Sequence, residues 1–190
     1  PTVPDGTSFS DTLSAEWTLT RMPLADEVYL QSTWKRWQRQ RFSTGGRLFA
    51  ELLYHQIPAG EGAVNIDYAL TSYGYDDFGH QNQVTTPGGT IQKTVFNALG
   101  QPLEQWTGIS SGTLVRTSLS IYDTGATTGP GLLTSITLFV DGVAANNRVQ
   151  NYAYDWRHRL EMSDILVTLG TTPTKLITKN TYDNRDNSIE

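Results

Sequence analysis

The chain has 190 residues, a formal net charge of −5 at pH 7 and no cysteine. The absence of cysteine excludes disulfide bonds and thiolate metal sites, and the acidic balance argues against general affinity for nucleic acid. No apolar run approaches the ~20 residues that a membrane-spanning helix needs.

The N-terminal part of the chain is the least repetitive. We expect residues 1–34 to be a lead-in segment and residues 35–190 to form a repetitive β-sheet region, together one structural domain. The chain begins at Pro1 without a Met or an apolar leader. We therefore expect that a leader was removed or that the chain is a piece of a longer protein.

Residues 24–42 allow two interpretations. Asp26 and Glu27 could begin a helix, because acids favour the first helical turn. The Thr, Tyr and Trp residues favour a strand instead, and a long strand is the interpretation we prefer. Its basic residues could attract an acidic glycan, but a solvated or interface strand is the simpler interpretation. The residues on one face would be Gln31, Thr33, Lys35, Trp37, Arg39 and Arg41, and the basic set is Lys35, Arg36, Arg39, Arg41 and Arg47.

Short alternating segments fill the rest of the chain. Residues 64–70, 113–122 and 148–154 alternate apolar and mostly polar side chains, which predicts half-buried strands. Residues 132–140 lead into Asp141-Gly142, a hairpin signal. About eleven strands and no convincing helix are predicted, so the fold class is all-β.

An aromatic residue leads into a short turn five times. One structural unit copied along a chain predicts units that stack on their neighbours. The interval from one motif to the next is long enough for two short strands and two turns. The Phe42 segment resembles a further, degenerate copy. The five motifs are Tyr75-Asp76-Asp77-Phe78-Gly79, Phe96-Asn97-Ala98-Leu99-Gly100, Tyr122-Asp123-Thr124-Gly125, Tyr154-Asp155-Trp156-Arg157-His158 and Tyr182-Asp183-Asn184-Arg185-Asp186.

Each motif position has an expected structural role. The Asp or Asn accepts hydrogen bonds from nearby backbone N–H groups, and the Gly supplies a positive φ. His158 and Asp186 replace the Gly in two copies, and both residue types are found at positive φ. Gly125 comes one residue early, which predicts a different turn. We expect the rings to be buried, with Val84, Leu103 and Leu160 packed between them, and Tyr154 to be a core residue.

These motifs resemble the RHS/YD-repeat family of bacterial secreted or cell-surface proteins. The resemblance rests on the recurring Tyr-Asp pair and Gly turn, on Arg159-Leu160 after Tyr154-Asp155, and on the segment 72–106. It implies consecutive antiparallel β-hairpins that form a continuous curved or spiralling sheet, open at its ends. It also implies an extracellular location and a shell that often surrounds a toxic cargo, and carbohydrate binding has been associated with such repeats.

The last copy is predicted to be incomplete. Tyr182-Asp183 is followed by too few residues for its second strand to form before Glu190. An open edge exposes backbone N–H and C=O groups that invite another strand. We therefore expect self-association, or pairing with the remainder of a parent chain, through β-edges.

Catalytic and ligand sites have little support in the sequence. His55, His80 and His158 are scattered, no Gly-x-Ser-x-Gly elbow occurs, and Asp76-Asp77 is a poor acid/base pair. The Asp183–Asn187 segment is rich in oxygen ligands, but Arg185 interrupts the calcium-loop pattern. We expect no enzyme activity, catalytic residue, metal site or cofactor.

The expected function is that of a non-enzymatic extracellular scaffold module that assembles into a shell or fibre. The first alternative is a carbohydrate-binding module, in which Trp34, Trp37 and Trp106 would stack on sugars, although such rings more often pack in a core. The second is part of a toxin-encapsulating shell. Such a shell needs many more strands than this chain offers.

Overall fold

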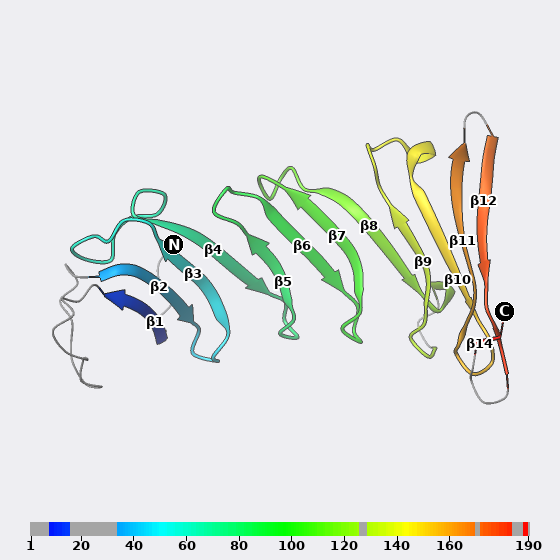
Figure 1. Ribbon diagram of the computed structural model, residues 1–190, viewed down its shortest axis with the longest axis horizontal. Helices are drawn as coiled ribbons and strands as arrows, with labels where there is room; N and C mark the ends of the chain where they lie inside the picture. Colours follow the sequence, from blue (N-terminus) through cyan, green and yellow to red (C-terminus); the bar gives the residue numbers. More distant parts are fainter. Residues whose placement is uncertain (1–7, 16–33, 126–128, 170–171, 184–187, 190) are drawn as a thin grey trace. The chain divides into compact units, whose positions relative to one another are not determined.

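A computed structural model describes residues 8–15, 34–125, 129–169, 172–183 and 188–189 of the chain. Apart from two short 3₁₀ turns, Asp123–Gly125 and Ala144–Asn146, the regular elements in these ranges are strands. Successive strands pair antiparallel with their sequence neighbours, as in a row of hairpins (Figure 1). The predicted all-β class and hairpin organisation are therefore confirmed.

The chain divides into two compact units, and the first comprises residues 1–92 and 109–111. Its strands are hydrogen-bonded to one another in the order of the sequence. The first pair is β1 with β2, which face each other at eight positions. β1 lies within the predicted lead-in segment. The strands are β1 (Ser8–Ala15), β2 (Trp34–Phe42), β3 (Leu48–Tyr54), β4 (Tyr68–Tyr75) and β5 (Gln81–Thr85).

The second unit comprises residues 93–108 and 112–190. It contains most of β6 and then six further strands, again ordered as in the sequence, with a separate two-stranded ladder of β13 and β14. The strands are β6 (Ile91–Phe96), β7 (Pro102–Gly108), β8 (Val115–Tyr122), β9 (Leu133–Leu138), β10 (Arg148–Tyr154), β11 (Leu160–Leu169), β12 (Thr172–Lys179), β13 (Thr181–Tyr182) and β14 (Ser188–Ile189).

Several strand predictions need correction. β10 coincides with the predicted 148–154, but residues 65–67 form a turn, and Asp67 accepts a hydrogen bond from the N–H of Ala63 at 2.7 Å. Asp141-Gly142 does not close a two-residue hairpin, because β9 ends at Leu138 and the connection runs through the 3₁₀ turn at Ala144. In the segment 24–42, residues 34–42 form a strand, as preferred, while 24–33 lie outside the described residues.

The last repeat also differs from its prediction. Ser188 and Ile189 pair antiparallel with Tyr182 and Thr181, so this copy does begin its second strand. The expectation that no second strand could form was wrong. Asp186, the predicted turn residue of this copy, lies outside the described residues.

The core of the first unit lies at β2 and β3, not at the repeat aromatics. Trp37, Ala50, Leu52 and Tyr54 are its buried residues, and Leu52 is fully buried. The Trp37 and Tyr54 rings stack with their centroids 3.8 Å apart. Trp37 and Tyr54 also face each other in the β2–β3 register, which explains the stack.

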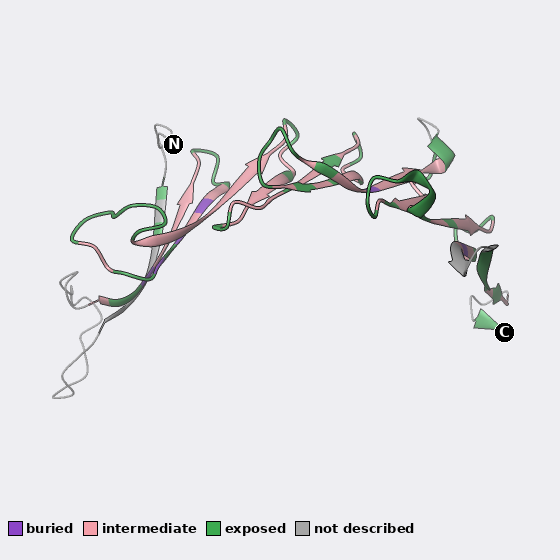
Figure 2. Ribbon diagram, turned by 90° about the horizontal axis from the view of Figure 1, so that it is seen from above, coloured by how far each residue is buried: buried purple, intermediate pink, exposed green. Residues whose placement is uncertain are grey.

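Most of the described strand residues are only half-buried (Figure 2). The repeat rings belong to this class, and so do Val84, Leu103 and Leu160. The predicted burial of these rings, and of Tyr154 as a core residue, was therefore wrong. One sheet layer explains this result, because a ring at a strand end has a neighbour on one side and solvent on the other. The rings concerned are Tyr75, Phe96, Tyr122, Tyr154 and Tyr182.

The basic strand face is not simply solvated. The Arg39 guanidinium lies 4.7 Å from the centroid of the Trp37 ring, and its Nη1 is 3.0 Å from Oε1 of Glu61. Arg41 lies 3.4 Å from the same carboxylate. These two side chains are 15% and 13% exposed, whereas Lys35, Arg36 and Arg47 are exposed as expected.

Candidate functional site

The feature that recurs in both units is a five-residue turn. In each copy the N–H of the first residue donates to the carbonyl of the fifth, and the N–H of the fourth donates to the carbonyl of the first. The ten hydrogen bonds span 2.8–3.0 Å. The copies are residues 43–47, 76–80, 86–90, 97–101 and 155–159.

The fourth position of this turn always has a positive φ. Gly supplies it at four turns, with φ between 75° and 93°, and His158 supplies it at 64°. Gly has no Cβ to clash in this region, whereas a residue such as His adopts it at a cost. The predicted positive φ is confirmed at Gly79 and Gly100, and also at His158, which replaces the Gly in its copy.

The side chain of the first residue fixes the turn from inside. Oδ1 of Asp76 accepts from the N–H groups of Phe78 and His80 at 3.0 and 2.8 Å. Oδ1 of Asp155 accepts in the same way from the third and fifth residues of its own turn, and so does Oδ1 of Asn97. The predicted turn role of Asp76, Asn97 and Asp155 is therefore confirmed.

The second oxygen of each Asp binds the side chain at the fifth position. Oδ2 of Asp155 lies 2.6 Å from Nε of Arg159, and Oδ2 of Asp76 lies 2.8 Å from Nδ1 of His80. Burial alone would raise the pKa of both carboxyls, but the hydrogen bonds from His80 or Arg159 outweigh it and hold each pKa below its usual value.

The repeat tyrosines link neighbouring hairpins. In four copies the Tyr hydroxyl donates to the backbone carbonyl of the first residue of the preceding strand, or, for Tyr182, of β11. We call this hydrogen bond the tyrosine clamp. Its members are Tyr75–Leu48 at 2.7 Å, Tyr122–Pro102 at 3.2 Å, Tyr154–Leu133 at 2.9 Å and Tyr182–Leu160 at 2.8 Å.

The fifth residue of one turn reaches the next turn on the same side of the sheet. Nη1 of Arg159 donates to the carbonyl of Asp183 at 3.2 Å, and its guanidinium lies 4.6 Å from the centroid of the Tyr182 ring. Nε2 of Gln101 donates to the carbonyl of Gly131 at 2.7 Å. Arg47 lies over the Tyr75 ring, 5.6 Å from its centroid. The turns at 43–47, 97–101 and 155–159 are thus each tied to a later copy both by their fifth residue and by a tyrosine clamp.

The Asp123 copy keeps these contacts in a longer loop. The N–H of Asp123 donates to the carbonyl of Leu132, and its carboxylate accepts from the N–H groups of Gly131 and Leu132. Asp123, Thr124 and Gly125 all have positive φ. The prediction of a different turn at this copy is confirmed.

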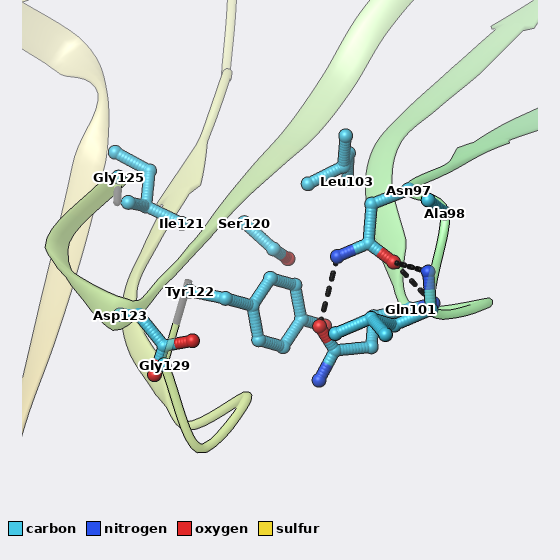
Figure 3. A pocket seen from close by; sticks show the side chains of 11 residues that line it. Asn97, Ala98, Gln101, Leu103, Ser120, Ile121, Tyr122, Asp123, Gly125 and Gly129 are labelled. Carbon is cyan, nitrogen blue, oxygen red and sulfur yellow. Dashed lines mark hydrogen bonds between the residues drawn. The ribbon is translucent and has the colours of Figure 1, made fainter. Parts of the chain in front are cut away.

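A hollow of about 760 Å³ lies between the turn at 97–101 and this loop (Figure 3). Its polar groups are already engaged. Nδ2 of Asn97 donates to Oε1 of Gln101, the Tyr122 hydroxyl donates to Pro102, and the Asp123 carboxylate holds its own loop. The hollow therefore offers few groups to a polar ligand.

The predicted glycan-stacking tryptophans have partners within their own units. Trp37 is 2% exposed, covered by Tyr54, and in edge contact with Trp34 at 5.1 Å. In the second unit, Nε1 of Trp106 donates to Glu104, and Arg116 lies near its ring. Trp156 is 81% exposed at the tip of the turn at 155–159.

The three histidines have local structural contacts. His55 Nε2 lies 2.9 Å from the carbonyl of Ile66, His80 binds Asp76, and His158 occupies the left-handed turn position. Within the described ranges, no three His, Cys, Asp or Glu side chains gather as metal ligands. Most of the Asp183–Asn187 segment lies outside those ranges. The described residues also contain no helix long and apolar enough to cross a bilayer.

Two features were not predicted from the sequence. The turn Thr86–Thr90 has no aromatic before it, although its Thr86 and Gly89 match the first and fourth positions. The clamp acceptors are backbone carbonyls, which any residue provides. The signal available was the spacing of 20–27 residues between each Tyr and its acceptor.

Comparisons with known proteins give a coarse likeness. No protein-family model and no curated protein matches the chain. One similar structure is TcdB2-TccC3 without its hypervariable C-terminal region, with 15% identity and a TM-score of 0.44, covering 81% of this chain and 9% of that one. Another is the Photorhabdus luminescens Tc holotoxin pore with a mutation in TccC3, with 14% identity and a TM-score of 0.23, covering 87% and 13%. At these TM-scores the likeness carries no argument about function.

Proposed function

We propose that this chain is a non-enzymatic structural module of the YD-repeat kind. It forms one segment of the β-sheet of a larger extracellular scaffold or shell, and strand pairing joins it to the neighbouring segments. The observation that carries the proposal is the tyrosine clamp, repeated at Tyr75, Tyr122, Tyr154 and Tyr182. A contact that ties hairpin to hairpin serves cohesion along a sheet, whereas a binding site needs convergent groups left for a ligand.

The chemistry of the motif supports the same proposal. The Asp carboxylates that would be candidates for acid/base work are held by backbone N–H groups and by the fifth side chain of their turns. Their pKa values lie below the usual range, which disfavours a role as proton donors near neutral pH. We extend the proposal to an extracellular location, on the motif's resemblance alone.

Light scattering over a wide range of protein concentrations, combined with a glycan array, tests this function. We expect assembly that depends on concentration, or capture of other strands at the sheet edges, and a blank array. Saturable binding of a glycan by the monomer would overturn the proposal in favour of a carbohydrate-binding module. A toxin-encapsulating shell would appear as this module within a longer chain, so co-purification of the native protein with its flanking segments addresses that form.

A further inference from the structure

The outer edge of β12 is available along most of its length. β12 pairs with β11 over eight positions, from Lys179 opposite Met162 to Thr172 opposite Leu169. Among the described strands it pairs with no other, and residues 174–179 are all exposed. Leu176 and Ile177 are 64% and 56% exposed although they face opposite sides of the sheet.

The direction of the backbone groups of β12 follows from one hydrogen bond. The N–H of Asn180 donates to the carbonyl of Glu161 on β11 at 2.8 Å. In an antiparallel ladder the N–H and C=O groups of successive residues alternate between the two sides. Lys175, Ile177 and Lys179 therefore direct their backbone groups away from β11, toward the outer edge.

Two neighbours define where this outer edge begins and ends. Thr181 has the same parity as Lys179, and it pairs with Ile189 of β14. A strand thus already lies antiparallel against the chain immediately beyond β12. At the other end, Pro173 has the same parity and no N–H to donate, as is common for proline at a sheet edge. The open stretch is residues 174–180.

The charges along this stretch select the partner. Lys175, Ile177 and Lys179 share one face of the strand, and Asp164 on β11 lies 2.7 Å from Nζ of Lys175. A second copy paired symmetrically about Ile177 would set Lys175 opposite Lys179, and like charges directly opposite are unfavourable. An acidic residue opposite each lysine is favourable.

We propose that the outer edge of β12 binds an extended strand of another polypeptide, antiparallel to β12 and in line with β14. The bound strand places acidic side chains opposite Lys175 and Lys179 and an apolar side chain opposite Ile177. Its main-chain hydrogen bonds supply affinity and its alternating side chains supply selectivity, as in other cases of strand addition. This inference rests on the proposed scaffold function and names the edge, the register and the partner chemistry.

The probe is a fluorescent synthetic peptide, Thr-Glu-Thr-Val-Thr-Glu-Thr, titrated into the full chain and followed by anisotropy. In the proposed register its two Glu residues and its Val direct their N–H groups at β12. N-methylation of these three residues is expected to weaken binding about tenfold or more, and N-methylation of the Thr residues between them to have little effect. A peptide with Lys in place of Glu should also bind weakly.

Variants of the protein locate the site. Ile177→Pro removes an outward N–H without breaking the ladder to β11 and should abolish binding, whereas Ile177→Thr keeps that N–H and should retain it. Lys179→Glu should weaken binding of the Glu peptide and strengthen binding of the Lys peptide. Misfolding of the variant cannot produce this exchange of preference. No binding, or binding insensitive to N-methylation and to these variants, would overturn the inference. If the chain assembles by itself and the Ile177→Pro variant does not, the occupant of the edge is a second copy of the chain. That result would overturn the inference and leave the scaffold function intact.

Discussion

The hydroxyl of Tyr154 donates a 2.9 Å hydrogen bond to the backbone carbonyl of Leu133, which lies 21 positions earlier in the sequence. Tyr154 ends β10 and Leu133 begins β9, so the bond closes the end of one hairpin against the strand before it. The adjacent Asp155 folds the following turn. This dipeptide therefore has two roles. Tyr154 binds the preceding strand of the sheet, and Asp155 stabilises the turn that follows it.

The turn chemistry predicts a difference between two substitutions at Asp155. Asp155→Ala removes the acceptor of the Arg157 and Arg159 N–H groups, so the urea midpoint of unfolding should fall. Asp155→Asn keeps an oxygen in that position, as Asn97 does in its own turn, and should fall less. Equal midpoints for the two variants would show that the backbone hydrogen bonds do not stabilise the turn.

The fourth turn position predicts a reciprocal pair of substitutions. Gly89 has a φ of 81°, and no atom lies within 4 Å of the position that a Cβ would take there. Gly89→Ala therefore changes only backbone strain and should cost about 1–2 kcal/mol in the free energy of unfolding. His158→Gly relieves the same strain at a φ of 64° and should stabilise the chain by less than about 1 kcal/mol, because Gly also loosens the unfolded state. Chemical denaturation of both variants checks the opposite signs, and a destabilised His158→Gly would contradict this account.

The core predicts a contrast between two adjacent leucines. Leu52 is fully buried beside Trp37 and Tyr54, so Leu52→Ala should cost about 2–5 kcal/mol. Leu53 points to the other face and is 48% exposed, so Leu53→Ala should cost less than about 1 kcal/mol. Thermal or urea unfolding of both provides the comparison. Similar losses at the two sites would place the core elsewhere.

Alkaline titration tests two tyrosines of the first unit. A hydrogen bond to Glu51 and burial raise the pKa of Tyr73 from 10.0 to about 12, and burial raises the pKa of Tyr54 to about 12. A folded-state pKa above the unfolded value stabilises the fold fully below pH 10, and this contribution is lost as the pH rises through about 12. The free energy of unfolding should therefore decline over that window.

The matched variant is Tyr73→Phe, which removes one of the two tyrosines whose pKa is raised to about 12. Its alkaline loss of stability should be smaller than that of the parent, and ultraviolet titration should show one fewer late-ionising tyrosine. If all tyrosines ionise together near their ordinary pKa, the hydrogen bond from Tyr73 to Glu51 does not persist in solution.

The fold class followed from the sequence because its determinants are local. Alternation over residues 148–154 specifies a strand, and Asp155 and Gly79 specify turns through their own side chain or lack of one. The exchange of Gly for His158 was also predictable, because the left-handed conformation is a property of a single residue.

The clamp and the core depended on which strands meet, which local pattern does not encode. The Tyr154 ring has the sequence pattern of a core residue, and only its place at the rim of a single sheet layer explains why it is half-buried. The sequence pattern predicts that Arg39 is a solvated charge. In the structure it forms an ion pair with Glu61 of the β3–β4 connection, a contact that the pattern does not encode. The start of the last strand at Ser188 was missed because two residues carry no periodicity.

The measurement that tests the tyrosine clamp most directly is the unfolding free energy of Tyr154→Phe. The variant loses only the hydroxyl, so the ring packing is kept and the hydrogen bond to Leu133 is removed. The matched control is Tyr152→Phe on the same strand, whose hydroxyl makes no hydrogen bond within the described part of the chain. We expect a loss of about 1 kcal/mol for Tyr154→Phe and almost none for the control. Equal stability of the two variants would contradict the clamp.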